Sequence, residues 1–238
     1  SELKYILQAP YWKVALQMLG DLQALRCIHP TLDLDRELWR QLRLLEHFLL
    51  GRKKGEGEIG RGGDWEMGRK AGGEMGRDSY QLPIINIPDW QMRLEVLITY
   101  LAPEYREKVA TNLQLPADSI QRLQELEARK IEILERLPQC ELPSQLVLLL
   151  RKYELPMLIA IALQSPRIIR HQIWQYLAKW ANIESPLNGN DLKALGYKPG
   201  PGFKLMLDAL LAARLDGVAS DRTDAISFLL QHYPQSQK

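Results

Sequence analysis

Apolar residues recur every three or four positions along most of the chain, the spacing expected of helices that bury one face. After residue 88 such segments follow one another closely, and a proline often stands at or just before the first turn, where its missing N–H does no harm. No segment alternates like a strand between hairpin turns. The pattern predicts an all-α fold, a multihelical array of short helices at 89–101, 103–113, 117–137, 143–153, 156–163, 166–181, 189–195, 203–215 and 221–233.

Two further helices are predicted before residue 51. The first runs from Ala9 to Leu25, begins at Pro10, and carries one apolar face made of Val14, Ala15, Met18, Leu19, Leu22 and Leu25. The second follows Pro30, with Leu38, Leu42, Leu45 and Leu49 on its apolar face. Asp33 or Asp35 is placed to cap its free N–H groups.

The composition changes abruptly at residues 51–79, which hold ten of the sixteen glycines. With little apolar surface to offset the entropy of ordering, this stretch is expected to be a flexible insertion, continued by a linker to residue 88. A basic RNA-binding segment is the alternative. Its seven basic and six acidic residues argue against that alternative.

Composition places the chain among ordinary globular proteins. The chain has 238 residues, of which 46% are hydrophobic and 25% charged, with a formal net charge of +2. So small a total gives no case for nucleic-acid binding, but residues 165–204 carry six basic residues against two acidic ones. A local basic zone is therefore predicted in the C-terminal part of the chain.

Cysteine content and hydropathy exclude several classes of protein. The chain has two cysteines, Cys27 and Cys140, far apart in sequence, so neither a disulfide framework nor a zinc site is indicated. The longest apolar runs, Leu146–Leu150 and Leu155–Leu163, are shorter than the roughly 20 residues of a membrane span. No signal peptide precedes the helical pattern that begins near Ser1, which suggests a fragment of a longer cytoplasmic protein with no membrane partner.

No catalytic constellation is found in the sequence. Asp33-Leu-Asp35 has the spacing of a Mg²⁺-binding pair on a strand, but it leads directly into a helix and is expected to cap it. The four histidines are scattered without the spacing of metal ligands, and the glycine-rich insertion lacks a phosphate-binding motif. We therefore predict no catalytic residue and no metal site.

Two features suggest binding instead. On the helix predicted at 166–181, Arg167, Arg170, His171 and Trp174 gather opposite the apolar face, so the indole can stack on a base while the cations meet phosphates. The alternative is that Trp174 packs on another helix and the arginines are merely solvated.

The second feature is the loop before the helix predicted at Phe203. Asn188 or Asn190 can cap a short helix, and Gly196 falls where a left-handed helix end is needed. A rigid turn and a helix N-terminus follow, and together they are expected to form a phosphate-binding site. The alternative is that this segment is only a tight corner between two helices. The candidate RNA-binding residues are Arg167, Arg170, His171, Trp174, Lys193, Lys198, Gly200, Gly202 and Lys204.

Motifs at both ends of the chain resemble one known family. Gly189-x-Asp191-Leu192-x-x-Leu195-Gly196-Tyr197-x-Pro199-Gly200-Pro201, followed by an apolar helix, is similar to the C-terminal motif of bacterial class II tRNA nucleotidyltransferases and related poly(A) polymerases. Residues 1–35 resemble the neck of those enzymes, with Ala15-Leu16-x-x-Leu19 and Leu25…His29-Pro30-x-Leu32. Lys204 departs from the small glycine of many relatives.

The resemblance implies that catalysis belongs to a domain other than the helices of this chain. In that family a head domain carries the Mg²⁺-binding carboxylates and the selection of ATP or CTP, so no cofactor is expected in this chain and Asp33 and Asp35 inherit no catalytic role. The resemblance further implies neck-like helices at 1–50, an insertion and linker at 51–88, a helical body at 89–185 and a helical tail at 186–238.

The leading hypothesis is a tRNA-binding C-terminal region that positions an RNA 3′ end for a head domain of the same polypeptide and is inactive alone. The alternative is a helical protein-interaction scaffold with no nucleic-acid role.

Overall fold

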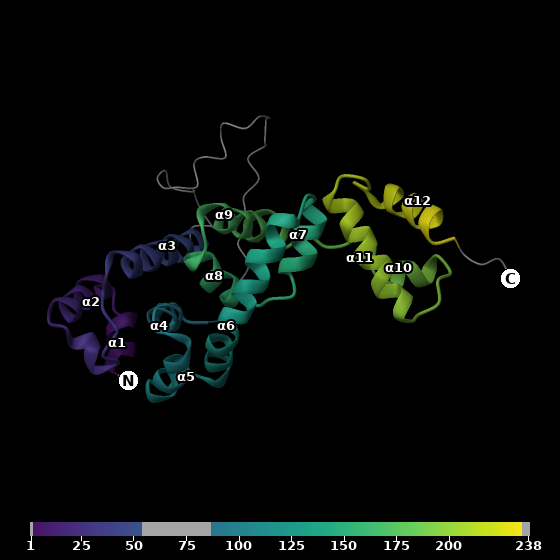
Figure 1. Ribbon diagram of the computed structural model, residues 1–238. Helices are drawn as coiled ribbons and strands as arrows, with labels where there is room; N and C mark the ends of the chain where they lie inside the picture. The colour runs from purple at the N-terminus through teal and green to yellow at the C-terminus, as the bar shows by residue number, and fades with distance from the viewer. Residues whose placement is uncertain (1, 54–86, 235–238) are drawn as a thin grey trace, which may run out of the picture.

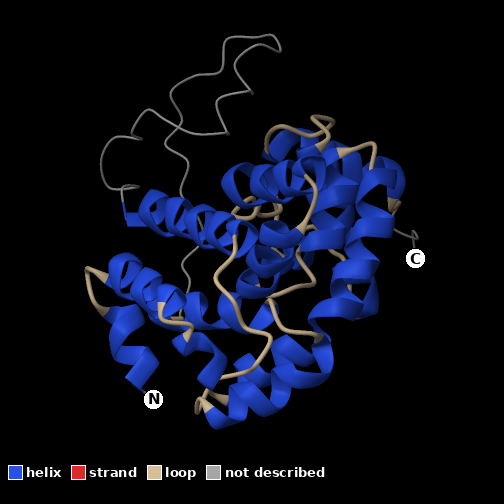
Figure 2. Cartoon of the chain, turned by 60° about the vertical axis from the view of Figure 1, so that its left-hand side comes forward, coloured by secondary structure: helices blue, strands red, loops and turns tan. Residues whose placement is uncertain are grey.

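The computed structural model describes residues 2–53 and 87–234, and within these ranges the chain forms helices and no strand (Figures 1 and 2). The predicted all-α class is confirmed. The expected insertion at 51–88 lies outside the described residues, apart from its two ends. The N-terminal helices are α1 Glu2–Gln8, α2 Trp12–Asp21, the 3-10 turn η1 Ala24–Cys27 and α3 Arg36–Lys53.

The second described range contains most of the helices. They are α4 Asp89–Thr99, α5 Pro103–Asn112, α6 Ala117–Arg136, η3 Leu137–Gln139, α7 Pro143–Leu150, α8 Leu155–Gln164, α9 Arg167–Gln175, the π-helical turn η4 Tyr176–Trp180, α10 Gly189–Ala194, α11 Pro201–Leu215 and α12 Arg222–His232. These bounds follow the predicted ones closely because proline fixes so many starts. Pro103, Pro143 and Pro201 stand in the first turns of α5, α7 and α11.

The predicted apolar face of the first helix is wrong at three of its six positions, whereas Leu25 is buried and Leu19 packs against the main core. Trp12 and Leu16 are the buried residues of α2, whereas Val14, Met18 and Leu22 are 65%, 59% and 73% exposed. The segment is also divided, since α2 ends at Asp21 and η1 follows. Leu16 and Trp12 occupy a second apolar stripe, and it is this stripe that meets the main core.

The main core draws on nearly the whole chain before the tail. Its buried residues run from Leu3 in α1 to Leu177 in η4, so the N-terminal helices and the central helices share one apolar interior. A separate small core lies in the tail, between Leu187 and Leu229, and unites α10, α11 and α12. In Figure 1 these three helices lie at the end of the array opposite α1 and α2.

Helix α4 lies at the centre of the main core and carries charges into it. Every residue from Gln91 to Thr99 is buried, including Arg93 and Glu95. Arg122 of α6 binds Glu95 at 3.0 Å and reaches on to the exposed Glu154 at 2.8 Å. The Ser119 hydroxyl also donates to Glu95. The buried carboxylate is thus fully engaged, which is the condition for keeping a charge inside a protein.

The other buried charge of α4 fastens the N-terminal helices. Arg93 forms an ion pair with Glu46 of α3 at 3.1 Å and donates to the carbonyl of Leu7, the penultimate residue of α1, at 2.7 Å. Its guanidinium also lies 4.7 Å from the ring centre of Trp12. One side chain therefore joins α1, α2 and α3 to α4.

The tail is joined to the central helices through α7 and α11. Asp216, just beyond the last turn of α11, accepts hydrogen bonds from the Ser144 backbone N–H at 3.0 Å and from its hydroxyl at 2.6 Å, in the first turn of α7. Arg151 at the end of α7 binds Asp208 of α11 at 2.6 Å. Both acidic residues thus contact the α7 segment from α11.

No helix within residues 2–53 and 87–234 is both long and apolar enough to span a bilayer.

Substitutions on α2 distinguish its two apolar stripes. Leu16→Ala removes a fully buried side chain and is expected to lower the free energy of unfolding by about 2–5 kcal/mol, whereas Met18→Ala, at an exposed position, should cost under about 0.5 kcal/mol. Urea unfolding followed by circular dichroism measures both. Equal losses from the two variants would contradict the observed burial.

Breaking the buried ion pair should be costly. Arg122→Met leaves Glu95 without its cation in the interior, and we expect a loss of about 3–5 kcal/mol in the free energy of unfolding. Arg129→Met on the same helix is the matched control, because Arg129 pairs with Glu125 at the surface and should contribute under about 1 kcal/mol. Similar losses in both variants would show that Arg122 has no special role.

Candidate nucleic-acid interface

The Asp33-Leu-Asp35 pair is structural, as predicted. Asp35 accepts the backbone N–H of Leu38 at 2.8 Å and so caps α3, while Asp33 forms an ion pair with Arg26 at 3.3 Å. No group of three or more metal-ligating side chains occurs in the described parts of the chain.

One of the cations predicted on α9, Arg170, acts on an acidic residue of α3. Arg167 and His171 are exposed and Arg170 is half-buried. Glu37 of α3 is held by a hydrogen bond from Arg40, which with smaller help from the positive charge of Arg170 lowers the pKa of Glu37 to about 2. Part of the positive potential of this face is therefore opposed by a carboxylate that stays ionised throughout the physiological range.

The solvent-side position expected for Trp174 is wrong. Its ring stacks on Phe48 of α3, with ring centres 5.0 Å apart, and packs against the main core. The packing alternative considered for this residue is the one observed. A side chain 126 positions away in sequence provides the partner, so no local pattern on α9 indicates it.

The cap of the short tail helix is confirmed. Asn188 accepts the N–H groups of Asn190 and Asp191, and Asp191 accepts the N–H of Asn188 in return. Arg222 of α12 binds Asp191 at 2.6 Å, which ties the cap to the last helix. Gly196, with φ of 91°, ends α10 in the left-handed conformation predicted for it.

The loop after Gly196 leaves its glycines uncrowded. Gly200 is extended and exposed, and a Cβ built on it would meet nothing within 4 Å. A Cβ on Gly202 would meet only Met206, at 3.9 Å. Helix α11 begins at Pro201, two residues before the predicted start. Internal packing therefore does not demand glycine at either position, and Lys193 and Lys198 are exposed nearby in sequence.

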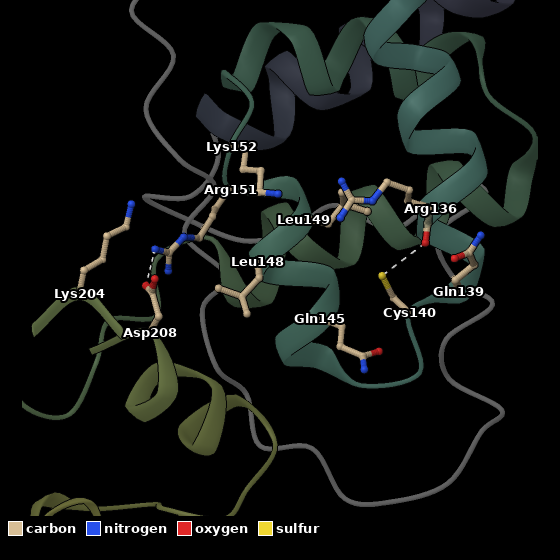
Figure 3. Close-up of a pocket in the computed structure, with 10 residues that line it drawn as sticks. All are labelled: Arg136, Gln139, Cys140, Gln145, Leu148, Leu149, Arg151, Lys152, Lys204 and Asp208. Carbon is tan, nitrogen blue, oxygen red and sulfur yellow. Dashed lines mark hydrogen bonds and ion pairs between the residues drawn. The ribbon is translucent and has the colours of Figure 1, made fainter. Parts of the chain in front are cut away.

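A polar hollow of about 490 Å³ lies between the end of α6, α7 and α11 (Figure 3). Of the nine predicted RNA-binding residues, Lys204 is the one that lines it. In Figure 3 the charged ends of Lys204, Arg151, Lys152 and Arg136 follow one another across the hollow. We call this hollow the junction groove, and its lining is Arg136, Gln139, Cys140, Gln145, Leu148, Leu149, Arg151, Lys152, Lys204 and Asp208.

The lining of the junction groove is strongly cationic. Four basic side chains face one acidic side chain, Asp208, a net of three positive charges. Arg136 shares its charge with Glu132 at 3.0 Å, and Arg151 with Asp208. Lys152 and Lys204 are exposed and have no ion-pair partner among the described residues. Such a row of donors suits a chain of phosphates.

The groove lacks a surface for stacking. None of its lining residues is aromatic, whereas proteins that bind unpaired bases commonly stack them on Phe, Tyr or Trp. The groove is therefore chemically suited to the sugar–phosphate backbone rather than to splayed bases.

Three of the four cations of the groove, Arg136, Arg151 and Lys152, were not among the predicted RNA-binding residues. Arg136 belongs to a segment in which acidic residues predominate, and Arg151 and Lys152 directly follow the apolar run Leu146–Leu150. The sequence signal that could have indicated Arg151 and Lys152 is their position as two adjacent basic residues at the end of an otherwise apolar helix.

Comparison with known proteins gives a consistent family of folds. The CCA-adding enzyme of Thermotoga maritima, solved in complex with tRNA, matches with a TM-score of 0.63 and 16% identity over 97% of this chain. A tRNA-processing enzyme solved with CTP matches with a TM-score of 0.61 and 14% identity over 90% of the chain. The chain spans about half the length of each of these structures.

A curated relative agrees with them. The A-adding tRNA nucleotidyltransferase of Geobacter sulfurreducens is 38% identical over 56 residues, which is 24% of this chain and 6% of that protein. No family model matches the chain. At these identities the structural likeness concerns the fold, and at that level the resemblance to tRNA nucleotidyltransferases is confirmed.

The thiols provide a test of the groove's geometry. Cys140 is half-buried in the groove and burial raises the pKa of its thiol, whereas Cys27 on η1 is exposed. Less thiolate and less access should make Cys140 the slower of the two to react with iodoacetamide at pH 8. Peptide mass spectrometry of timed samples measures both rates, and faster alkylation of Cys140 would contradict the described burial.

Proposed function

We propose that the chain is the RNA-binding helical region of a tRNA nucleotidyltransferase or poly(A) polymerase, and that its junction groove holds the sugar–phosphate backbone of tRNA. The observation that carries the proposal is the row of four basic side chains from α6, α7 and α11 in a hollow without aromatic residues. The fold likeness to CCA-adding enzymes supports tRNA as the RNA concerned.

The proposal divides the chain as the family resemblance implies. Residues 1–50 act as a neck, 89–185 as a body and 186–238 as a tail, and the groove lies where body and tail meet. Nucleotide addition belongs to a head domain of the same polypeptide, which would hold Mg²⁺ and ATP or CTP. The chain alone then positions RNA in the cytoplasm without catalysing transfer.

The predicted α9 residues have a secondary place in this proposal. Arg167 and His171 are exposed and remain available to a bound RNA, as do Lys193 and Lys198. Trp174 does not contribute by base stacking, because its ring is already stacked on Phe48.

A helical protein-interaction scaffold is the second candidate, and one observation favours it. Tyr11, Val14, Met18 and Leu22 form an exposed apolar stripe along α2. Contiguous apolar surface of this kind commonly marks a contact with another protein. Such a contact is compatible with RNA binding at the groove, so the decisive question is whether RNA binds there.

The proposal is tested by neutralising the two unopposed lysines. Because the groove is expected to contact phosphates through both, Lys152→Gln with Lys204→Gln should weaken tRNA binding at least about tenfold at 0.1 M salt. The slope of log K against log salt should fall by about two. Fluorescence anisotropy with labelled whole tRNA across a salt series measures both quantities.

A second double variant controls for net charge. Lys13→Gln with Lys108→Gln removes the same charge from exposed positions on α2 and α5, away from the groove, and should leave tRNA binding within about twofold. An equal loss of tRNA affinity in the two double variants would show that the effect comes from net charge and not from the groove. Absence of tRNA binding by the unaltered chain would refute the proposal and favour the scaffold. A minihelix and a duplex DNA of equal charge report whether tRNA shape is preferred.

A further inference from the structure

The junction groove contains one acidic side chain, and it is bound to one of the four cations. Asp208 of α11 lies 2.6 Å from the guanidinium of Arg151, and the two side chains are 30% and 36% exposed. The contact is drawn as a dashed line in Figure 3. An anion is thus already bound to Arg151 before any RNA arrives.

A carboxylate and a phosphate compete for the same donors. Both present two or more anionic oxygens to the planar fork of a guanidinium, which binds either at similar distances. A phosphate can therefore bind Arg151 fully only when Asp208 is displaced. Otherwise the phosphate meets a paired arginine and a nearby like charge, which weakens its binding.

The joint between body and tail does not depend on this contact. Asp216, eight positions further along the chain, holds the first turn of α7 through two hydrogen bonds from Ser144. Leu215 packs against the main core as well. Helix α11 can therefore remain packed on α7 when Asp208 releases Arg151. This ion pair is not needed to hold the two helices together.

We propose that Asp208 is an internal competitor for phosphate, whose carboxylate occupies on Arg151 the position that an RNA phosphate takes. The inference rests on the proposed function and adds to it a residue that sets the affinity and selectivity of the groove. A short anion cannot offset the lost ion pair, whereas a polyanion that also engages Lys152, Lys204 and Arg136 can. Asp208 thus favours long RNA backbones over mononucleotides and free phosphate.

The test compares two substitutions that remove the same charge from the same part of the tail. Asp208→Asn should tighten binding of whole tRNA by roughly threefold to tenfold, because the pair to be broken is a partly exposed one. It should also steepen the salt dependence by up to about one. Asp216→Asn should leave tRNA affinity within about twofold while lowering thermal stability, since Ser144 loses its ionised acceptor.

Competition by short anions measures how strongly the groove prefers a long RNA backbone. AMP at millimolar concentration should compete with tRNA more effectively in Asp208→Asn than in the unaltered chain. Asp208→Ser, which removes the same charge with a smaller side chain, should reproduce both effects, and far-UV circular dichroism confirms that each variant is folded.

The outcomes separate this inference from the proposed function. If the unaltered chain binds tRNA and Asp208→Asn binds it equally or more weakly, Asp208 has only a structural role. The inference is then overturned while the proposed function stands. If Asp216→Asn tightens binding as much as Asp208→Asn, the effect is one of net charge and the inference is again overturned. If the unaltered chain binds no tRNA at any salt concentration, both fail together.

Discussion

The burial of α4 on every side is the constraint on which the arrangement of the other helices depends. A helix with an apolar residue at every interior position would be free to rotate among several packings, but α4 carries Arg93 and Glu95 into the core. Each charge is tolerable only beside an opposite charge, since an unpaired ion in the interior would cost several kcal/mol. Glu46 of α3 and Arg122 of α6 are those partners, and they fix the rotation of both helices about α4.

The groove follows from this arrangement through α6 and α7. Once α6 is held by Arg122, its last turn presents Arg136 beside α7, whose apolar face enters the core through Leu146, Val147, Leu149 and Leu150. The remaining face of α7 ends in Arg151 and Lys152, and α11 completes the groove with Lys204 and Asp208. Helix α6 thus carries both a member of the buried charge pair, Arg122, and a cation of the groove, Arg136.

The sequence predicted the helices well and their contacts less well, for physical reasons. Proline starts, the Asn188 cap and the left-handed Gly196 are local features whose chemistry is complete within a few residues. Which of two apolar stripes on α2 is buried depends on α4 and α3, and the partner of Trp174 is on α3. The groove combines residues 136, 151, 152 and 204, so only Lys204, which lies in a basic and glycine-rich segment, was visible as a candidate.

The central claim, that tRNA occupies the groove between α7 and α11, is tested most directly by the two cysteines of the chain. Cys140 lines the groove and Cys27 is exposed on η1. Alkylation with iodoacetamide with and without saturating tRNA, quantified peptide by peptide, compares the two thiols within one molecule. We expect tRNA to slow alkylation of Cys140 several-fold and to leave Cys27 nearly unchanged. Unaltered alkylation of Cys140 at a tRNA concentration shown to saturate the chain would place the RNA elsewhere and contradict the account.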